Sequence, residues 1–90
     1  MEPVIMPIED VLDLHTFNPK EVGDLLDDYF SACVDKGIFS VRIIHGKGKG
    51  ILKKRVHSIL KRHSLVISYQ EATPEAGGWG ATFAVLKRTP

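Results

Sequence analysis

One stretch, residues 43–52, constrains the fold of this chain more than any other. It runs Ile-Ile-His-Gly-Lys-Gly-Lys-Gly-Ile-Leu, so an apolar segment leads through a histidine into alternating glycine and lysine and then into a helical pattern. A strand that ends in a glycine-rich turn at a helix start presents unpaired backbone N–H groups and the positive end of the helix dipole. Glycine also lets a phosphate approach the backbone closely. The stretch therefore predicts an anion-binding loop.

The remaining residues predict an α/β two-layer sandwich that holds this loop. Asn18, Pro19 and Gly37 are typical N-cap, first-turn and C′ residues for the first of two helices. The element order β-α-β-α-β-β, with right-handed crossovers, predicts a mixed four-stranded sheet with both helices on one face. The first three strands should be parallel and the last antiparallel. We expect strands at residues 11–15, 40–45, 65–70 and 81–87, helices at 19–36 and 51–63, and a loop at 72–80.

The length of 90 residues predicts one small domain, folded over residues 11–90 after an extended arm at 1–10. No apolar window approaches the roughly 20 residues that a membrane span needs, so we expect no membrane association. The single cysteine, Cys33, excludes an internal disulfide and favours a reducing cytoplasm. It falls on the apolar face of the first helix, where we expect inert packing.

Charge is strongly segregated, although the net charge is only +1. Residues 1–35 contain nine acids and one base, whereas residues 36–70 contain nine bases and no acid. Nucleic-acid affinity depends on local positive potential. The basic residues of the segment 36–70 therefore favour a nucleic-acid partner. The acidic face of the helix at 19–36 repels phosphates, so we expect nucleic acid to bind away from it.

Three residues at predicted strand ends favour phosphodiester chemistry. Asp13 and His15 end the first strand on one face, and His45 ends the second, so all three should reach the carboxyl edge of the sheet beside the glycine loop. We expect Asp13 to orient His15 as general base or acid, and His45 to transfer a second proton or fix the phosphate. The expected phosphate-binding residues are Gly46, Lys47, Gly48, Lys49 and Gly50, with Lys53, Lys54 and Arg55 extending the track.

Other interpretations of the same residues stay open. Asp13, His15 and His45 could ligate Zn²⁺ or Mn²⁺, although no short metal-binding spacing supports this. The loop could serve a small-molecule phosphate enzyme, but it is not a Walker A motif. His57 is interpreted as solvated or phosphate-facing and His63 as packing. Trp79, between Gly78 and Gly80, could stack on a base or pin its loop to the sheet, and the glycines could donate backbone hydrogen bonds.

The chain resembles the Smr (small MutS-related) domain family. Three motifs match in order: Leu-Asp-Leu-His at 12–15, His-Gly-Lys-Gly-Lys-Gly at 45–50 and Gly-Gly-Trp-Gly-Ala-Thr at 77–82. The family pattern usually continues the first motif with glycine, where this chain has Thr16. The substitution can change the shape of the turn but removes neither chemical group.

The resemblance implies a fold like the C-terminal domain of bacterial translation initiation factor three. Several family members are nicking endonucleases or RNA-cleaving enzymes, and others only bind. The family motifs fall on Asp13 and His15, and on His45, Gly46 and Gly48. The expected function is therefore binding and cleavage of DNA or RNA, with a non-catalytic binding or adaptor module as the alternative. A Mg²⁺ or Mn²⁺ cofactor and association with a ribosome or repair complex are further expectations.

Overall fold

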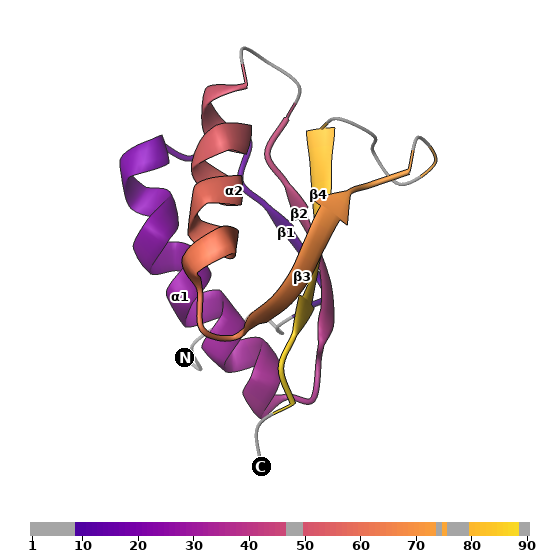
Figure 1. The fold of residues 1–90 in the computed structure, drawn as a ribbon. Coiled ribbons are helices and arrows are strands. Elements are labelled where there is room, and N and C mark those ends of the chain that lie inside the picture. The colour runs from indigo at the N-terminus through magenta and orange to yellow at the C-terminus, as the bar shows by residue number, and fades with distance from the viewer. Residues whose placement is uncertain (1–8, 47–49, 74, 76–79, 89–90) are drawn as a thin grey trace, which may run out of the picture.

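A four-stranded sheet with two helices on one of its faces forms the domain (Figure 1). The structure is a computed structural model, and it describes residues 9–46, 50–73, 75 and 80–88. The strands are β1 (Val11–Asp13), β2 (Ser40–Ile44), β3 (Val66–Glu71) and β4 (Ala81–Leu86), and the helices are α1 (Pro19–Asp35) and α2 (Ile51–Arg62). The sequence prediction of a mixed sheet with two helices on one face is confirmed.

The strands lie in the order β1-β2-β4-β3. β1 pairs parallel with β2, and β4 is antiparallel to both of its neighbours, β2 and β3. The three strands predicted to be parallel do run in one direction, but the last strand of the chain separates β3 from β2. Because β4 is flanked on both sides, four of its six residues are buried.

The first helix begins and ends as its sequence predicts. The side chain of Asn18 accepts a hydrogen bond from the backbone N–H of Lys20, and Pro19 occupies the first turn. At the other end, Gly37 has a φ of 78° and donates to the carbonyl of Val34, while Ile38 donates to that of Cys33. This pair of hydrogen bonds is a Schellman motif, which requires the left-handed residue that glycine supplies.

The core lies between the helices and the sheet. It includes Leu14 of the β1 end, Phe30 and Cys33 of α1, Val41 and Ile43 of β2, and Val56 and Leu60 of α2. Burial of Cys33 confirms its predicted packing role. His63 packs its ring edge against Phe30 and hydrogen-bonds Asp27, which agrees with its interpretation as a packing residue.

The prediction for the first strand needs a correction. β1 ends at Asp13 rather than at residue 15, because the chain turns there and the N–H of Phe17 donates to the carbonyl of Leu14. The predicted arm at 1–10 lies largely outside the described residues. Of its last two residues, Glu9 accepts a hydrogen bond from the Tyr29 hydroxyl and Asp10 one from the N–H of Arg42. Within the described chain, neither helix is long and apolar enough to cross a membrane.

Candidate functional site

Asp13 and His15 form a hydrogen-bonded pair at the end of β1. Asp13 Oδ1 lies 2.5 Å from His15 Nδ1 and 3.0 Å from the backbone nitrogen of His15. Both side chains are open to solvent, with 49% of Asp13 and 57% of His15 exposed. The two groups are brought together by the turn after β1, whereas the sequence predicted that both would lie on one face of the strand.

The pair has a defined direction of hydrogen bonding. Two hydrogen bonds from His15, first from its backbone N–H and then from its ring, lower the pKa of Asp13, so its carboxylate is ionised at neutral pH. A carboxylate accepts hydrogen bonds, and Nδ1 of His15 must therefore bear the proton. In the neutral imidazole this leaves the lone pair on Nε2 free to accept a proton from a substrate.

Gly46 lies beside His15 and connects the pair to the glycine-rich loop. A Cβ added to Gly46 would lie 3.5 Å from the Cβ of His15, and the backbone at Gly46 has a φ of 83°. Gly50, at the far end of the loop, has a φ of 79° and begins α2 without a side-chain cap. The first amides of α2 thus retain hydrogen-bonding capacity for an anion. The loop residues Lys47, Gly48 and Lys49 lie outside the described part of the chain.

His45 lies on the opposite face of the sheet from the Asp13–His15 pair. In β2, Val41 and Ile43 face the helices, and His45 continues this alternation with only 4% of its surface exposed. Asp13 is instead in register with Ile44, whose side chain points to the face without helices. All three residues lie at or just beyond the ends of β1 and β2, but His45 faces the helices whereas Asp13 faces the other side of the sheet.

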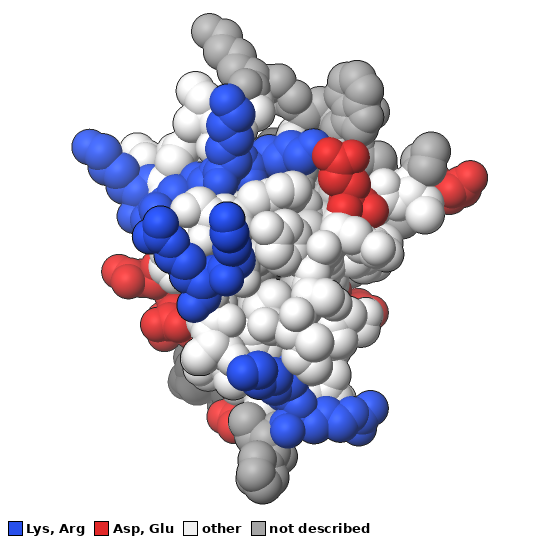
Figure 2. Space-filling model, viewed as in Figure 1, with Lys and Arg blue, Asp and Glu red and all other residues white. Residues whose placement is uncertain are grey.

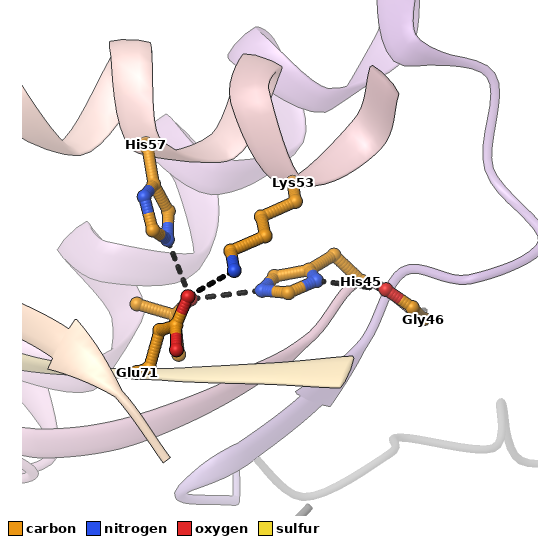
Figure 3. Close-up of polar contacts among 6 residues, drawn as sticks. His45, Gly46, Lys53, His57 and Glu71 are labelled. Carbon is orange, nitrogen blue, oxygen red and sulfur yellow. Dashed lines mark hydrogen bonds and ion pairs between the residues drawn. The ribbon is translucent and has the colours of Figure 1, made fainter. Parts of the chain in front are cut away.

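Thr82 of β4 joins His45 to His57 of α2. Its Oγ1 lies 2.8 Å from the Nε2 atoms of both histidines, and the two rings meet edge to face with centroids 6.0 Å apart. The other ring nitrogen of His45, Nδ1, lies 3.1 Å from the carbonyl oxygen of Gly46. Figure 3 shows the labelled rings of His45 and His57 approaching each other between α2 and the sheet. We call His45, Thr82 and His57 the histidine–threonine chain.

The hydrogen bonds of this chain are satisfied when both rings are neutral. Because the Gly46 carbonyl can only accept, Nδ1 of His45 donates to it, and Nε2 accepts from the Thr82 hydroxyl. The Thr82 oxygen then accepts from Nε2 of His57. Burial lowers the pKa of His45, and burial together with the nearby charges of His45 and Lys53 lowers the pKa of His57.

The interpretation of His57 as a solvated or phosphate-facing group was incomplete. The ring is partly buried, bonded to Thr82 and packed 5.2 Å from the ring of Tyr69. Thr82 itself, 0% exposed, was missed as a site residue. Its position at the end of the Gly-Gly-Trp-Gly-Ala-Thr motif at 77–82 was the sequence feature that could have indicated a role in the site. Gly80 of the same motif accepts hydrogen bonds from the N–H groups of His45 and Gly46, whereas Gly78 and Trp79 lie outside the described residues.

The cations of α2 point in different directions. Lys53 forms an ion pair with Glu71 of β3, which lowers the pKa of that carboxyl, and Lys54 is exposed on the same side. Arg55 lies over α1, where its guanidinium would be 3.4 Å from a Cβ at Gly23. Figure 2 shows lysine and arginine side chains gathered over α2, with an acidic side chain beside them and a second basic group near the lower end of the view. The predicted basic track thus follows α2, with Arg55 on its other side.

The three-ligand metal alternative is not supported by this arrangement. His45 uses both ring nitrogens in hydrogen bonds on the helix side of the sheet, away from Asp13 and His15. Among residues that the structure describes, no group of three histidine, cysteine or acidic side chains could hold a metal ion.

The fold and the three motifs define a small α/β domain with an exposed acid–base pair beside a glycine-rich loop, and comparison with known proteins gives this class a name. The sequence matches the Smr domain family over residues 12–87, and the chain belongs to that family. The chain is 38% identical over 80 residues to Endonuclease MutS2 of Thermomicrobium roseum and 41% identical over 76 residues to that of Staphylococcus carnosus. These alignments cover 89% and 84% of this chain, but the chain spans only 10% of the length of either relative.

Solved structures show the same fold. The Smr domain of Thermus thermophilus MutS2 superposes with a TM-score of 0.83 at 29% identity, covering 88% of this chain and 99% of that one. YdaL, a stand-alone small MutS-related protein from Escherichia coli, gives a TM-score of 0.81 at 28% identity, covering 90% and 66%. The SMR domain of NEDD4-binding protein 2 shares the fold, with a TM-score of 0.69 at 22% identity, covering 99% and 97%.

Proposed function

We propose that this domain binds nucleic acid and cleaves its phosphodiester backbone at the Asp13–His15 pair. The observation that supports this most strongly is the 2.5 Å contact between Asp13 Oδ1 and His15 Nδ1 in an exposed pair. A polymer is too large to enter a closed pocket, so its catalyst must lie at the surface. The relatives named Endonuclease MutS2 match 89% and 84% of this chain at 38% and 41% identity.

In this proposal His15 acts as the general base. Its Nε2 takes the proton from the attacking oxygen, which belongs to water or, in RNA, to the neighbouring 2′-hydroxyl. As that oxygen bonds to phosphorus, the bond to the leaving oxygen breaks, and the leaving oxygen takes a proton from solvent water. Asp13 holds the ring in the reactive tautomer and stabilises the imidazolium as it forms. This division of roles needs no proton on Asp13.

The loop supplies the phosphate contact in this proposal. Lys47 and Lys49, the open N-terminus of α2 at Gly50 and the cations of α2 would offset charge on the phosphoryl oxygens as it develops. A Mg²⁺ or Mn²⁺ ion would fit beside Asp13 only with substrate phosphates completing its shell, because such ions are commonly held by one or two carboxylates plus phosphate oxygens.

A second candidate, a binding module without catalysis, is favoured by the placement of His45. Its ring is buried and both of its nitrogens are occupied, so only one imidazole beside the loop is exposed for proton transfer. Such a module would bind nucleic acid through the same basic helix and leave it intact.

A gel assay separates these functions. Labelled single-stranded RNA and supercoiled DNA are incubated with the wild type and with His15→Ala, each with and without chelator, and binding is measured in parallel. We expect cleavage by the wild type and intact substrate with His15→Ala, which should still bind. The chelator lanes report any need for a cation. Binding without cleavage by the wild type would favour the adaptor function. Thermal stabilisation by mononucleotides but not by oligonucleotides would favour a small-molecule enzyme.

A further inference from the structure

A groove between α2 and β3 contains residues that the proposed catalytic step does not use. It lies on the helix side of the sheet, and its lining includes Lys54, His57, Lys61, Arg62 and Tyr69. The groove begins at Gly50, where α2 starts, and follows the helix toward its C-terminal end. Lys61, Arg62 and Tyr69 take part in neither the Asp13–His15 pair nor the glycine-rich loop.

The cations of the groove are spaced for a repeating anion. Lys53, His57 and Lys61 recur every four residues, as do Lys54, Ser58 and Arg62, so each turn of α2 presents polar or cationic groups on this side. From Lys53 to Lys61 the helix rises about 12 Å. None of the described lining residues is acidic, and Glu71, beside the groove, neutralises only Lys53. A row of this length suits a chain of phosphates better than a single one.

The wall opposite these cations is aromatic. Tyr69 of β3 is partly exposed, and its ring lies 5.2 Å from that of His57 at an interplanar angle of 58°. Thr82 holds His57 from the far side, so the ring has a fixed orientation. An aromatic face beside a cationic row is the combination that binds unpaired bases together with their phosphates. Bases within a duplex are stacked inside and cannot reach such a face.

We propose that the groove between α2 and β3 binds a single-stranded segment of nucleic acid, with its phosphates on Lys54, Lys61 and Arg62 and a base on Tyr69. The inference rests on the proposed function and specifies its substrate class. Gly50 lines the groove and Gly46 lies beside His15, so one end of the glycine-rich loop is at the groove and the other is at the acid–base pair. A nucleic-acid strand bound in the groove would thus extend toward His15 across the carboxyl edge of the sheet.

The test is fluorescence anisotropy in the Asp13→Asn background, so that cleavage cannot remove the probe. The probes are a labelled oligo-uridine of about a dozen nucleotides, a duplex RNA of equal length and a poly-glutamate peptide. The variants are Lys61→Gln with Arg62→Gln, and Tyr69→Leu with Tyr69→Phe. The matched control is Lys87→Gln with Arg88→Gln, which removes the same two charges from exposed positions outside the groove.

We expect the groove pair of substitutions to reduce the salt dependence of oligo-uridine binding by about 1.4 in log–log slope, because a single strand loses about 0.7 per phosphate contact. Tyr69→Leu should weaken binding about tenfold while Tyr69→Phe leaves it unchanged, since stacking needs only the ring. Circular dichroism confirms that each variant is folded.

Three results would overturn the proposal: equal effects of the groove and control pairs, duplex bound as tightly as oligo-uridine, or poly-glutamate bound with the same response to Tyr69→Leu. The binding test and the catalytic proposal fail independently. Normal groove binding with no cleavage by the wild type would contradict only the catalytic proposal. Cleavage that depends on His15 but not on Lys61 or Arg62 would contradict only the groove.

Discussion

Thr82 Oγ1 lies 2.8 Å from Nε2 of His45, between the sheet and α2, and it lies equally close to His57. One hydroxyl therefore connects the end of β2, the start of β4 and the second turn of α2. Because the carbonyl of Gly46 accepts a hydrogen bond from the same His45 ring, the histidine–threonine chain also holds the start of the glycine-rich loop. The buried histidine of the second motif thus has a structural role that is visible in its contacts, whatever its part in proton transfer.

Removing the hydroxyl should destabilise the domain. Thr82→Val leaves the two Nε2 atoms without their partner, and each unsatisfied buried polar group costs about 1–3 kcal/mol. Thr82→Ser keeps the oxygen and should lose less. Urea unfolding followed by circular dichroism measures the difference, with Thr73→Val, at an exposed loop position, as the control. Equal urea midpoints for the Thr82→Val and Thr73→Val proteins would show that the histidine–threonine chain does not stabilise the fold.

Stability should fall as the pH drops below about neutral. The pKa values of His45 and His57 lie below the ordinary value of 6.5 in the folded protein, so the unfolded chain binds more protons between the two values. Their contribution is complete above pH 6.5 and is lost as the pH falls through that value toward the folded pKa. The charged side chains that face the two histidines are Lys53 and Glu71.

The measurement is the urea midpoint at several pH values between about 5 and 8, where histidine titrates. His57→Gln should flatten the decline, because one of the two titrating groups is gone. Asp13 contributes in a separate window: its lowered pKa means that its share is lost only in more acidic solution, below its ordinary value of 3.8. A midpoint that does not change from neutral to pH 5 would contradict the neutral histidine–threonine chain.

Gly50→Ala should affect both stability and binding, whereas Gly37→Ala should affect stability alone. Both glycines have a φ near 80°, and a Cβ at either position meets nothing within 4 Å, so the cost is that of the left-handed backbone, about 1–2 kcal/mol. Gly50 begins α2 at the proposed phosphate site, where a methyl group would keep a phosphate from the backbone. Equal affinities of the two variants for labelled RNA would remove Gly50 from the site.

The loop lysines should determine much of the salt dependence of binding. If Lys47 and Lys49 each contact a phosphate, replacing both with alanine reduces the log–log slope by about 1.4 on single-stranded RNA. Lys20→Ala with Lys36→Ala removes the same charge from exposed positions at the two ends of α1 and is the control. Titrations at several salt concentrations measure the slope, and a slope that both pairs change equally would indicate diffuse attraction without a phosphate site.

Local signals in the sequence predict most of the fold. The apolar stripe of α1, its Asn18 cap and its Gly37 terminus determine where the helix begins and ends, and the structure agrees within one residue. The position of β4 between β2 and β3 depends on pairing between segments distant in sequence, which periodicity does not report. The segment from Ala81 to Leu86 contains no charged residue, and this is the sequence feature that indicates a central strand.

The Asp13–His15 pair and the histidine–threonine chain also differ in how far the sequence predicts them. Asp13 and His15 are two residues apart, so a turn is enough to bring them together, and their pairing follows from sequence. His57 meets Thr82 only because α2 packs across the sheet, and its distance from the apolar stripe of α2 suggested solvent instead. The burial of His45 was available from alternation, since it follows Val41 and Ile43 on one face.

The most direct test of the central claim is the single-turnover cleavage rate of Asp13→Asn against that of Asp28→Asn, an exposed carboxylate of α1. With enzyme in excess and substrate saturated, the rate reports chemistry rather than binding. We predict that Asp13→Asn lowers the rate about a hundredfold or more, because His15 loses the carboxylate that orients its ring and stabilises the imidazolium. Asp28→Asn should leave the rate unchanged. Equal rates for the two variants, or no cleavage by the wild type, would contradict catalysis by the Asp13–His15 pair.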